Sequence, residues 1–202
     1  GNYMFYGCSF NGDHHSICWN NNANKIIKID TWTGSMDGYD NYPTANGVAC
    51  STTLSGRFYG SAFDGQYVWT APGPNGNMFV KIDFNGTMTG YNSWPAGSTE
   101  ADYVPGSGAA NVMYDGKSIW AIPSESTTIL KVDVGTGAMT AFYNSIPVGT
   151  KWEANFDPGT RSFWLRPAGS GASSRNVLHR ITFTTNIPDN GGIILQTGKS
   201  FY

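Results

Sequence analysis

Charged residues are scarce in this sequence. Asp, Glu, Lys and Arg make up 13% of the 202 residues, about half of the share of roughly 25% that is usual in soluble domains. The 12 Lys and Arg residues nearly balance the 14 Asp and Glu residues, and no run of like charge occurs. Nucleic acids attract proteins mainly through clustered Lys and Arg side chains. We therefore expect no nucleic-acid partner.

Long hydrophobic runs are also missing. A membrane-spanning helix needs about 20 consecutive apolar residues, and no segment approaches that length. The first ten residues do not combine a basic segment with an apolar one, as a secretory signal would. We expect no membrane insertion.

Residues with catalytic or metal-binding chemistry are few and scattered. Zinc sites usually show closely spaced pairs of ligands, whereas the three histidines, His14, His15 and His179, lack such a partner pair. No Gly-x-Ser-x-Gly motif, which would mark a hydrolase nucleophile, is present. We therefore predict no catalytic residue, no metal site and no cofactor.

A fourfold repeat organises the whole chain instead. Segments that begin at Phe10, Phe63, Tyr114 and Phe156 align with one another, and each contains a Trp residue at an equivalent place. These residues, Trp19, Trp69, Trp120 and Trp164, follow one another at intervals of 50, 51 and 44 residues. Repeats of about 40 to 50 residues are typical of propeller blades. We predict that the four Trp residues and the aromatic residues that begin the repeats lie in the core of the blades.

Each repeat reads as four short antiparallel strands. The first two strands meet at an Asn-Gly or Asp-Gly hairpin turn, and an alternating strand such as KIIKID follows. Strand periodicity predicts Ile27, Ile29 and Ile82 on one side of their sheets and Lys28 and Lys81 on the other. We predict an all-β fold, a β-propeller of four blades with four antiparallel strands each. Residues 1–202 would form a single domain, with blades at about 4–42, 57–94, 110–146 and 152–202.

The repeat also resembles a known family. The succession of Phe-Asp-Gly, Trp, Lys-Ile-Asp, Thr-Gly or Asn-Gly and a closing Tyr is similar to the blades of virginiamycin B lyase, YncE and NHL-like proteins. The resemblance implies a propeller, and for the lyase a metal-assisted site with His and Glu, which no positions here match. Family members usually have more than four blades. Three arrangements stay open: four blades that close alone, an excised part of a longer chain, or two chains that complete a ring as a homo-oligomer.

The most informative side chains for binding lie on the connections between repeats. We call the edge that carries these connections, and the loops between second and third strands, the loop face. Aromatic rings flanked by amides and acids suit sugar rings or protein partners. Alternatively, these rings pin long loops onto the blades. The predicted ligand-binding residues are Trp94, Glu100, Asp102, Tyr103 and Trp152.

The predicted function is non-enzymatic recognition of a surface glycan or protein partner, as in a lectin, an adhesin or a phage tail or spike protein. The predicted location is accordingly extracellular or virion-associated. One alternative is a polysaccharide lyase or glycoside hydrolase that uses two of the carboxylates of Glu100, Asp102 and Glu153. Another is a pure assembly scaffold in a virion or a secreted complex.

Three cysteines are present. The Asn11 to His15 turn would place Cys8 opposite Cys18 on neighbouring strands, where a disulfide is geometrically possible. Two buried thiols explain the pair equally well, and the odd third residue, Cys50, argues against a framework of disulfides.

Overall fold

In a computed structural model, the protein is built of β-strands alone over the residues that the structure describes, which are 5–13, 15–20, 25–51, 58–73, 76–96, 111–123, 127–143, 152–167, 178–182 and 194–197. Within these ranges, no helix has the length and apolar character needed to cross a membrane. The prediction of an all-β fold is confirmed.

Sixteen of the strands form four sheets of four antiparallel strands, each in chain order. The first sheet contains β1 (Phe5–Phe10), β2 (His15–Asn20), β3 (Ile26–Asp30) and β4 (Met36–Tyr39). The second contains β7 (Phe58–Phe63), β8 (Val68–Pro72), β9 (Phe79–Ile82) and β10 (Met88–Tyr91). The third contains β11 (Asn111–Tyr114), β12 (Ser118–Ile122), β13 (Ile129–Asp133) and β14 (Met139–Phe142). The fourth contains β15 (Trp152–Asp157), β16 (Ser162–Pro167), β17 (His179–Thr182) and β18 (Ile194–Thr197). A separate hairpin pairs β5 (Thr44–Ala45) with β6 (Val48–Ala49).

An Asn-Gly turn joins the first two strands of the first sheet, and Asp-Gly turns join those of the second and third sheets, as predicted. Between β7 and β8, Asp64 Oδ1 accepts the backbone N–H groups of Gln66 at 2.8 Å and Tyr67 at 2.6 Å. The next residue, Gly65, has a φ of +100°, a conformation that side chains with a Cβ rarely adopt. The dipeptide therefore determines where the hairpin turns.

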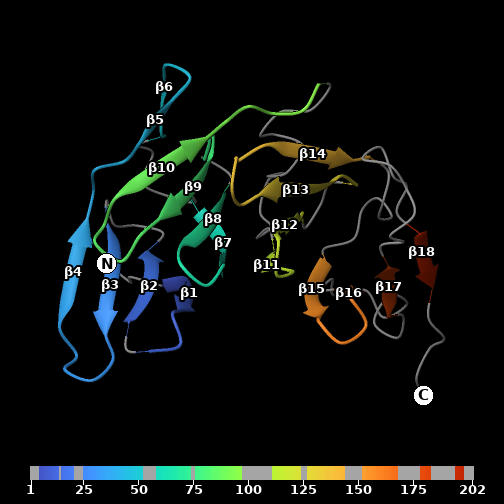
Figure 1. Ribbon diagram of the computed structural model, residues 1–202, viewed down its shortest axis with the longest axis horizontal. Helices are drawn as coiled ribbons and strands as arrows, with labels where there is room; N and C mark the ends of the chain where they lie inside the picture. The colour runs from blue at the N-terminus through green and yellow to red at the C-terminus, as the bar shows by residue number, and fades with distance from the viewer. Residues whose placement is uncertain are drawn as a thin grey trace.

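The sheets pack face to face in chain order. Their first strands lie against one another, since β1 contacts β7, β7 contacts β11 and β11 contacts β15. Three apolar clusters fill the contacts between the first and second, second and third, and third and fourth sheets. In Figure 1 the sheets follow one another from left to right without closing into a ring. The four-stranded sheets of the predicted propeller are thus present, but the described strands do not form a closed propeller.

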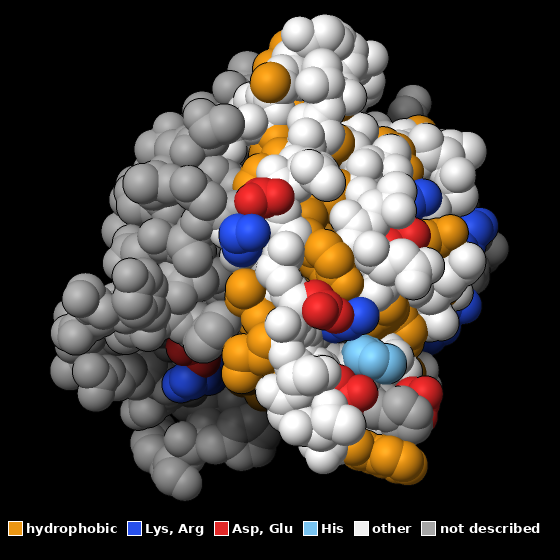
Figure 2. Space-filling view, turned by 90° about the vertical axis from the view of Figure 1, so that its left-hand side faces the viewer, with side chains coloured by type: hydrophobic (Ala, Val, Ile, Leu, Met, Phe, Trp, Pro, Cys, Tyr) orange, Lys and Arg blue, Asp and Glu red, His pale blue; other side chains and the backbone are white. Residues whose placement is uncertain are grey.

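Two of the repeated Trp residues, Trp69 and Trp120, lie in the contacts between sheets. Trp69 is 0% exposed and Trp120 is 3% exposed, whereas Trp164 is half-buried. The side chain of Trp19 lies outside the described residues. Sequence periodicity placed Phe10 in the core as well, and that prediction was wrong, because its side chain is 49% exposed. Phe10 belongs to the face of the first sheet that points away from the second, and Figure 2 shows hydrophobic side chains at the surface on this side of the molecule.

A disulfide joins Cys8 of β1 to Cys18 of β2. The two residues are direct register partners, as the position of the Asn11 to His15 turn predicted. Cys50 is buried and lies outside this disulfide. The structure thus selects the bridged alternative for the first two cysteines.

We expect that the unfolded, unreduced protein exposes one reactive thiol, because Cys50 is the one cysteine of the three outside the disulfide. Alkylation in denaturant followed by intact-mass measurement should add one label before reduction and three after it. Three labels without reductant would contradict the disulfide. A Cys50→Ser variant is the matched control, and it should take up no label before reduction and two after it.

Candidate functional site

Trp94 is the one predicted ligand-binding residue whose side chain the structure describes. Glu100, Asp102 and Tyr103 lie outside the described residues. Trp152 begins β15, but its side chain also lies outside them. The binding roles of these four residues stay predictions.

The Trp94 ring is anchored in the molecule. It follows β10, is half-buried and packs against the cluster between the second and third sheets. Its centroid lies 6.0 Å from that of Phe79, a residue that is 0% exposed. The ring therefore pins its connection to the core, as one of the two interpretations predicted, and presents a fixed aromatic surface on the loop face.

The first connection between sheets contains the β5–β6 hairpin, which sequence reasoning treated as a plain loop. Asn46 and Gly47 form its turn, with φ values of +48° and +78°. The Asn46 Nδ2 group donates to Asn92 Oδ1 at 2.8 Å and to Ser93 Oγ at 2.9 Å. Asn92 Nδ2 in turn donates to the carbonyl of Ala45 at 3.0 Å. The Asn-Gly dipeptide, a strong hairpin signal, was the clue that would have predicted this hairpin.

The side-chain amide of another residue, Asn77, holds the base of the hairpin. Asn77, in the loop between β8 and β9, accepts the backbone N–H of Ser51 at 3.0 Å and donates to the carbonyl of Ala49 at 2.9 Å. We call residues 44–51, Asn77 and residues 92–94 the loop platform. Asn46 and Ser93 are exposed within it. The platform therefore combines fixed amide and hydroxyl groups with an anchored aromatic ring, which suits hydrogen bonding to hydroxyls and stacking on an apolar ring face.

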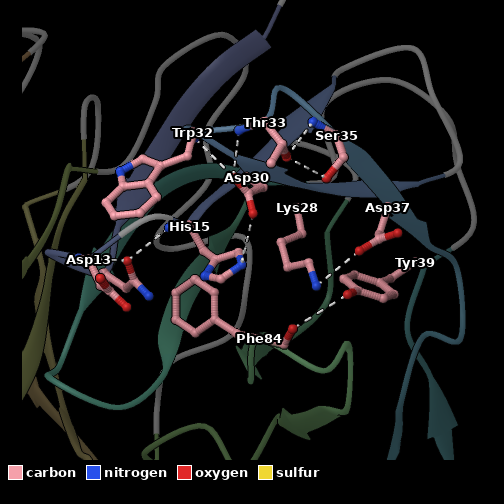
Figure 3. A network of polar contacts seen from close by, with 11 residues as sticks. Asp13, His15, Lys28, Asp30, Trp32, Thr33, Ser35, Asp37, Tyr39 and Phe84 are labelled. Atoms are coloured by element: carbon pink, nitrogen blue, oxygen red, sulfur yellow. Dashed lines mark hydrogen bonds and ion pairs between the residues drawn. The ribbon is translucent and has the colours of Figure 1, made fainter.

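The opposite edge of the sheets carries a polar network around Asp30 (Figure 3). Asp30 Oδ1 accepts the backbone N–H groups of Trp32 and Thr33, both at 2.9 Å. These two bonds, led by that from Thr33, lower the pKa of the Asp30 carboxyl. His15 Nε2 lies 3.9 Å from Asp30 Oδ2. In this view the His15 ring points toward the carboxylate from the neighbouring strand.

An Asp residue also accepts backbone N–H groups in the corresponding turns of the next two sheets, of which the turn at Asp83 is one residue shorter. Asp83 Oδ1 accepts the N–H groups of Asn85 and Thr87, and Asp133 Oδ1 accepts those of Gly135 and Thr136. Bonds from Thr136 are the main cause of the lowered pKa of Asp133. Because the pattern repeats with the blades, we assign these carboxylates to turn formation.

Two further ionisable candidates, Glu153 and His179, lie on strands of the fourth sheet. Glu153 forms an ion pair with Arg166, its register partner across β15 and β16. Burial lowers the pKa of His179 on β17. Within the described ranges, no group of three or more His, Cys, Asp or Glu side chains is placed to hold a metal ion.

Known proteins share this architecture without close sequence similarity. Virginiamycin B lyase from Staphylococcus aureus superposes with a TM-score of 0.55 at 18% identity, over 90% of this chain and 51% of that one. The Cps50 (Swd1) β-propeller domain of Myceliophteria thermophila gives a TM-score of 0.60 at 10% identity, over 97% and 58% of the two chains. The chain is a β-propeller repeat protein.

A third similar structure is that of an auxiliary nutrient binding protein from Bacteroides thetaiotaomicron, with a TM-score of 0.56 at 9% identity over 95% of this chain and 41% of that one. This β-propeller repeat protein therefore spans about half the length of the solved structures it matches. No protein-family model matches its sequence, and no curated protein is detectably similar to it. At these identities the likeness concerns the fold alone.

Proposed function

We propose that this chain is a non-enzymatic recognition domain that binds a surface glycan or a protein partner through its loop face. Residues 1–202 form one domain in this proposal, and the four sheets are four propeller blades at about 4–42, 57–94, 110–146 and 152–202. The observation that carries the proposal is the loop platform, in which amide groups are held beside an anchored Trp ring.

The chemistry of the loop platform favours a glycan. A sugar ring offers an apolar C–H face to an aromatic side chain and a rim of hydroxyls to amides. Asn46 and Ser93 are exposed at the platform, and Trp94 is held against buried Phe79. A site that is already ordered loses less conformational entropy when a ligand binds. Glu100, Asp102, Tyr103 and Trp152 complete the proposed ligand-binding set.

An extracellular or virion-associated location accords with this role. Disulfides persist in oxidising surroundings and are rare in the cytosol, and Cys8 and Cys18 are bridged. The sequence is rich in Asn, Gly, Ser and Thr and poor in Lys, a composition that resembles adhesins and phage tail or spike proteins.

A glycan array tests the proposal. We expect the wild-type protein to bind a subset of glycans. Trp94→Ala should weaken this binding by at least tenfold because it removes the aromatic ring. Asn46→Ala should weaken it to a similar extent because it removes the hydrogen bonds that hold the hairpin to Asn92 and Ser93. Trp32→Ala is the matched control. It removes a Trp that is 79% exposed on the opposite edge, and it should leave binding unchanged.

Three results would overturn the glycan version of this function. They are no binding by the wild-type protein, equal binding after Trp94 and Trp152 are both changed to Ala, and turnover of oligosaccharides. Turnover that vanished in Glu100→Gln or Asp102→Asn would establish the hydrolase or lyase alternative instead.

A further inference from the structure

The loop platform consists of uncharged residues. Its members, residues 44–51, Asn77 and residues 92–94, all of which the structure describes, include no Asp, Glu, Lys, Arg or His. At the top of Figure 2, where Figure 1 places the β5–β6 hairpin, the described surface is white and orange, without the colours of charged side chains. An anionic ligand on the platform would therefore meet no platform cation with which it could form a charge-assisted hydrogen bond.

Two cations at the same edge of the sheets already have anionic partners. Lys25 lies directly before β3 and Asp40 directly after β4, and Lys25 Nζ is 3.2 Å from Asp40 Oδ2. Arg166, near the end of β16, forms an ion pair with Glu153. These two cations therefore add no unmatched positive charge that would attract an acidic ligand.

The exposed amide and hydroxyl of the platform lie side by side as one acceptor and one donor. The Nδ2 group of Asn46 has two N–H donors, and it uses them toward Asn92 Oδ1 and Ser93 Oγ. Its Oδ1 atom is thus the part of this amide that can meet a ligand, and that atom only accepts. Ser93 Oγ accepts one bond and keeps its O–H as a donor.

This arrangement distinguishes a hydroxyl from an acidic group. A sugar hydroxyl both donates and accepts, so hydroxyls satisfy both Asn46 Oδ1 and the Ser93 O–H. The oxygens of an ionised carboxylate or sulfate only accept, so they would face Asn46 Oδ1 as a second acceptor and leave both atoms unsatisfied. The hydrogen bonding of the platform thus favours an uncharged sugar.

A second aromatic side chain is fixed to the same connection. Tyr143 directly follows β14 in the third sheet, and its side chain is 47% exposed. Its hydroxyl donates to the carbonyl of Ala96 at 2.8 Å. Ala96 lies two residues after Trp94, a separation of at most about 7 Å along the chain. Two aromatic rings from neighbouring sheets are therefore held at one connection of the loop face.

We propose that the loop platform binds an uncharged oligosaccharide of at least two rings, with one ring on Trp94 and the next on Tyr143. The proposal rests on the proposed function, because it names the ligand class of the same site. Hydroxyls of the sugar ring at Trp94 donate to Asn46 Oδ1 and accept from Ser93 Oγ. The two carboxylates of the proposed ligand-binding set accept bonds from sugar hydroxyls and would repel an acidic sugar.

A glycan array tests the ligand class when it holds neutral oligosaccharides beside the same oligosaccharides with a sulfate or carboxylate group on every ring. We expect the wild-type protein to bind neutral members, and we expect their acidic forms to bind more weakly by roughly tenfold or more. Binding of acidic forms alone, or of both forms with equal affinity, would overturn the inference and leave glycan recognition in place. Binding to no glycan on the array would overturn glycan recognition itself, and the inference with it.

Tyr143→Ala tests the second ring. The probes are the neutral disaccharide that the wild-type protein binds most tightly and the terminal monosaccharide of that disaccharide, both titrated by nuclear magnetic resonance. We expect the affinity for the disaccharide to fall by roughly tenfold, because an aromatic stacking surface is lost. The affinity for the monosaccharide should stay within about twofold. Tyr143→Phe keeps the ring and should retain most of the affinity for the disaccharide.

Phe10→Ala is the matched control for the loss of an exposed ring. Phe10 is 49% exposed on the outer face of the first sheet, so its removal should change neither affinity, and circular dichroism checks that all variants keep their fold. Unchanged affinity of Tyr143→Ala for the disaccharide would overturn the placement of a sugar ring on Tyr143. Equal losses of affinity for the disaccharide and the monosaccharide would overturn it as well, because Tyr143 would then support the site at Trp94 alone.

Discussion

Replacing Trp69 by Ala is expected to lower the free energy of unfolding by about 3–5 kcal/mol, the usual cost of truncating a buried Trp. The side chain is 0% exposed and packs between the second and third blades. Its ring stacks on Tyr91 with 5.1 Å between centroids. Its Nε1 group donates to Asp64 Oδ2 at 2.7 Å, so the change also removes a bond that ties the ring to the Asp-Gly turn.

Urea unfolding followed by far-ultraviolet circular dichroism measures this loss. Trp32→Ala is the control that removes the same side chain from a site where it is 79% exposed, and its effect should stay within about 0.5 kcal/mol. Equal effects of the two substitutions would contradict the placement of Trp69 between blades.

Replacing Gly137 by Ala is expected to lower the free energy of unfolding by about 2–5 kcal/mol, the sum of two effects. Gly137 has a φ of +74°, and an L-residue in that region costs about 1–2 kcal/mol. The new methyl group would also overlap the Tyr91 ring of the preceding blade, and overpacking of this kind typically costs about 1–3 kcal/mol.

Gly34→Ala separates the two effects. Gly34 occupies the same turn position with a φ of +72°, but a Cβ there meets nothing within 4 Å. It should therefore show only the backbone cost of about 1–2 kcal/mol. Equal losses of unfolding free energy at the two sites would show that the Tyr91 ring does not pack against Gly137 in the turn of the next blade.

The strands and turns could be predicted because their causes are local. Alternation along the strands, Asp-Gly or Asn-Gly turns and the fourfold repeat indicated the four-stranded sheets. The predicted pairing of Cys8 with Cys18 is confirmed because a hairpin turn determines the register of its two strands. The disulfide itself was left open, because residue types on paired positions do not distinguish a bridge from two thiols.

The candidate site was predicted less well. Trp94 was identified from its residue type and place, and its binding role stays a prediction. The β5–β6 hairpin was missed, although Asn46-Gly47 indicated a turn, because the bonds that hold it are not local. Asn46 and Asn92 are 46 residues apart in sequence.

The sequence by itself determined the repeat, the strands and their turns, because each depends on residues that are neighbours along one strand or across one turn. Only the tertiary structure decided which faces of the blades are covered. Ile27 and Val80 are equivalent in the repeat, yet Val80 is buried and Ile27 is half-buried. Phe10 and Phe63 are also equivalent, yet Phe63 is half-buried and Phe10 is exposed. Burial depends on the blade that lies next in space, and the open row of blades leaves the first blade without one among the described residues.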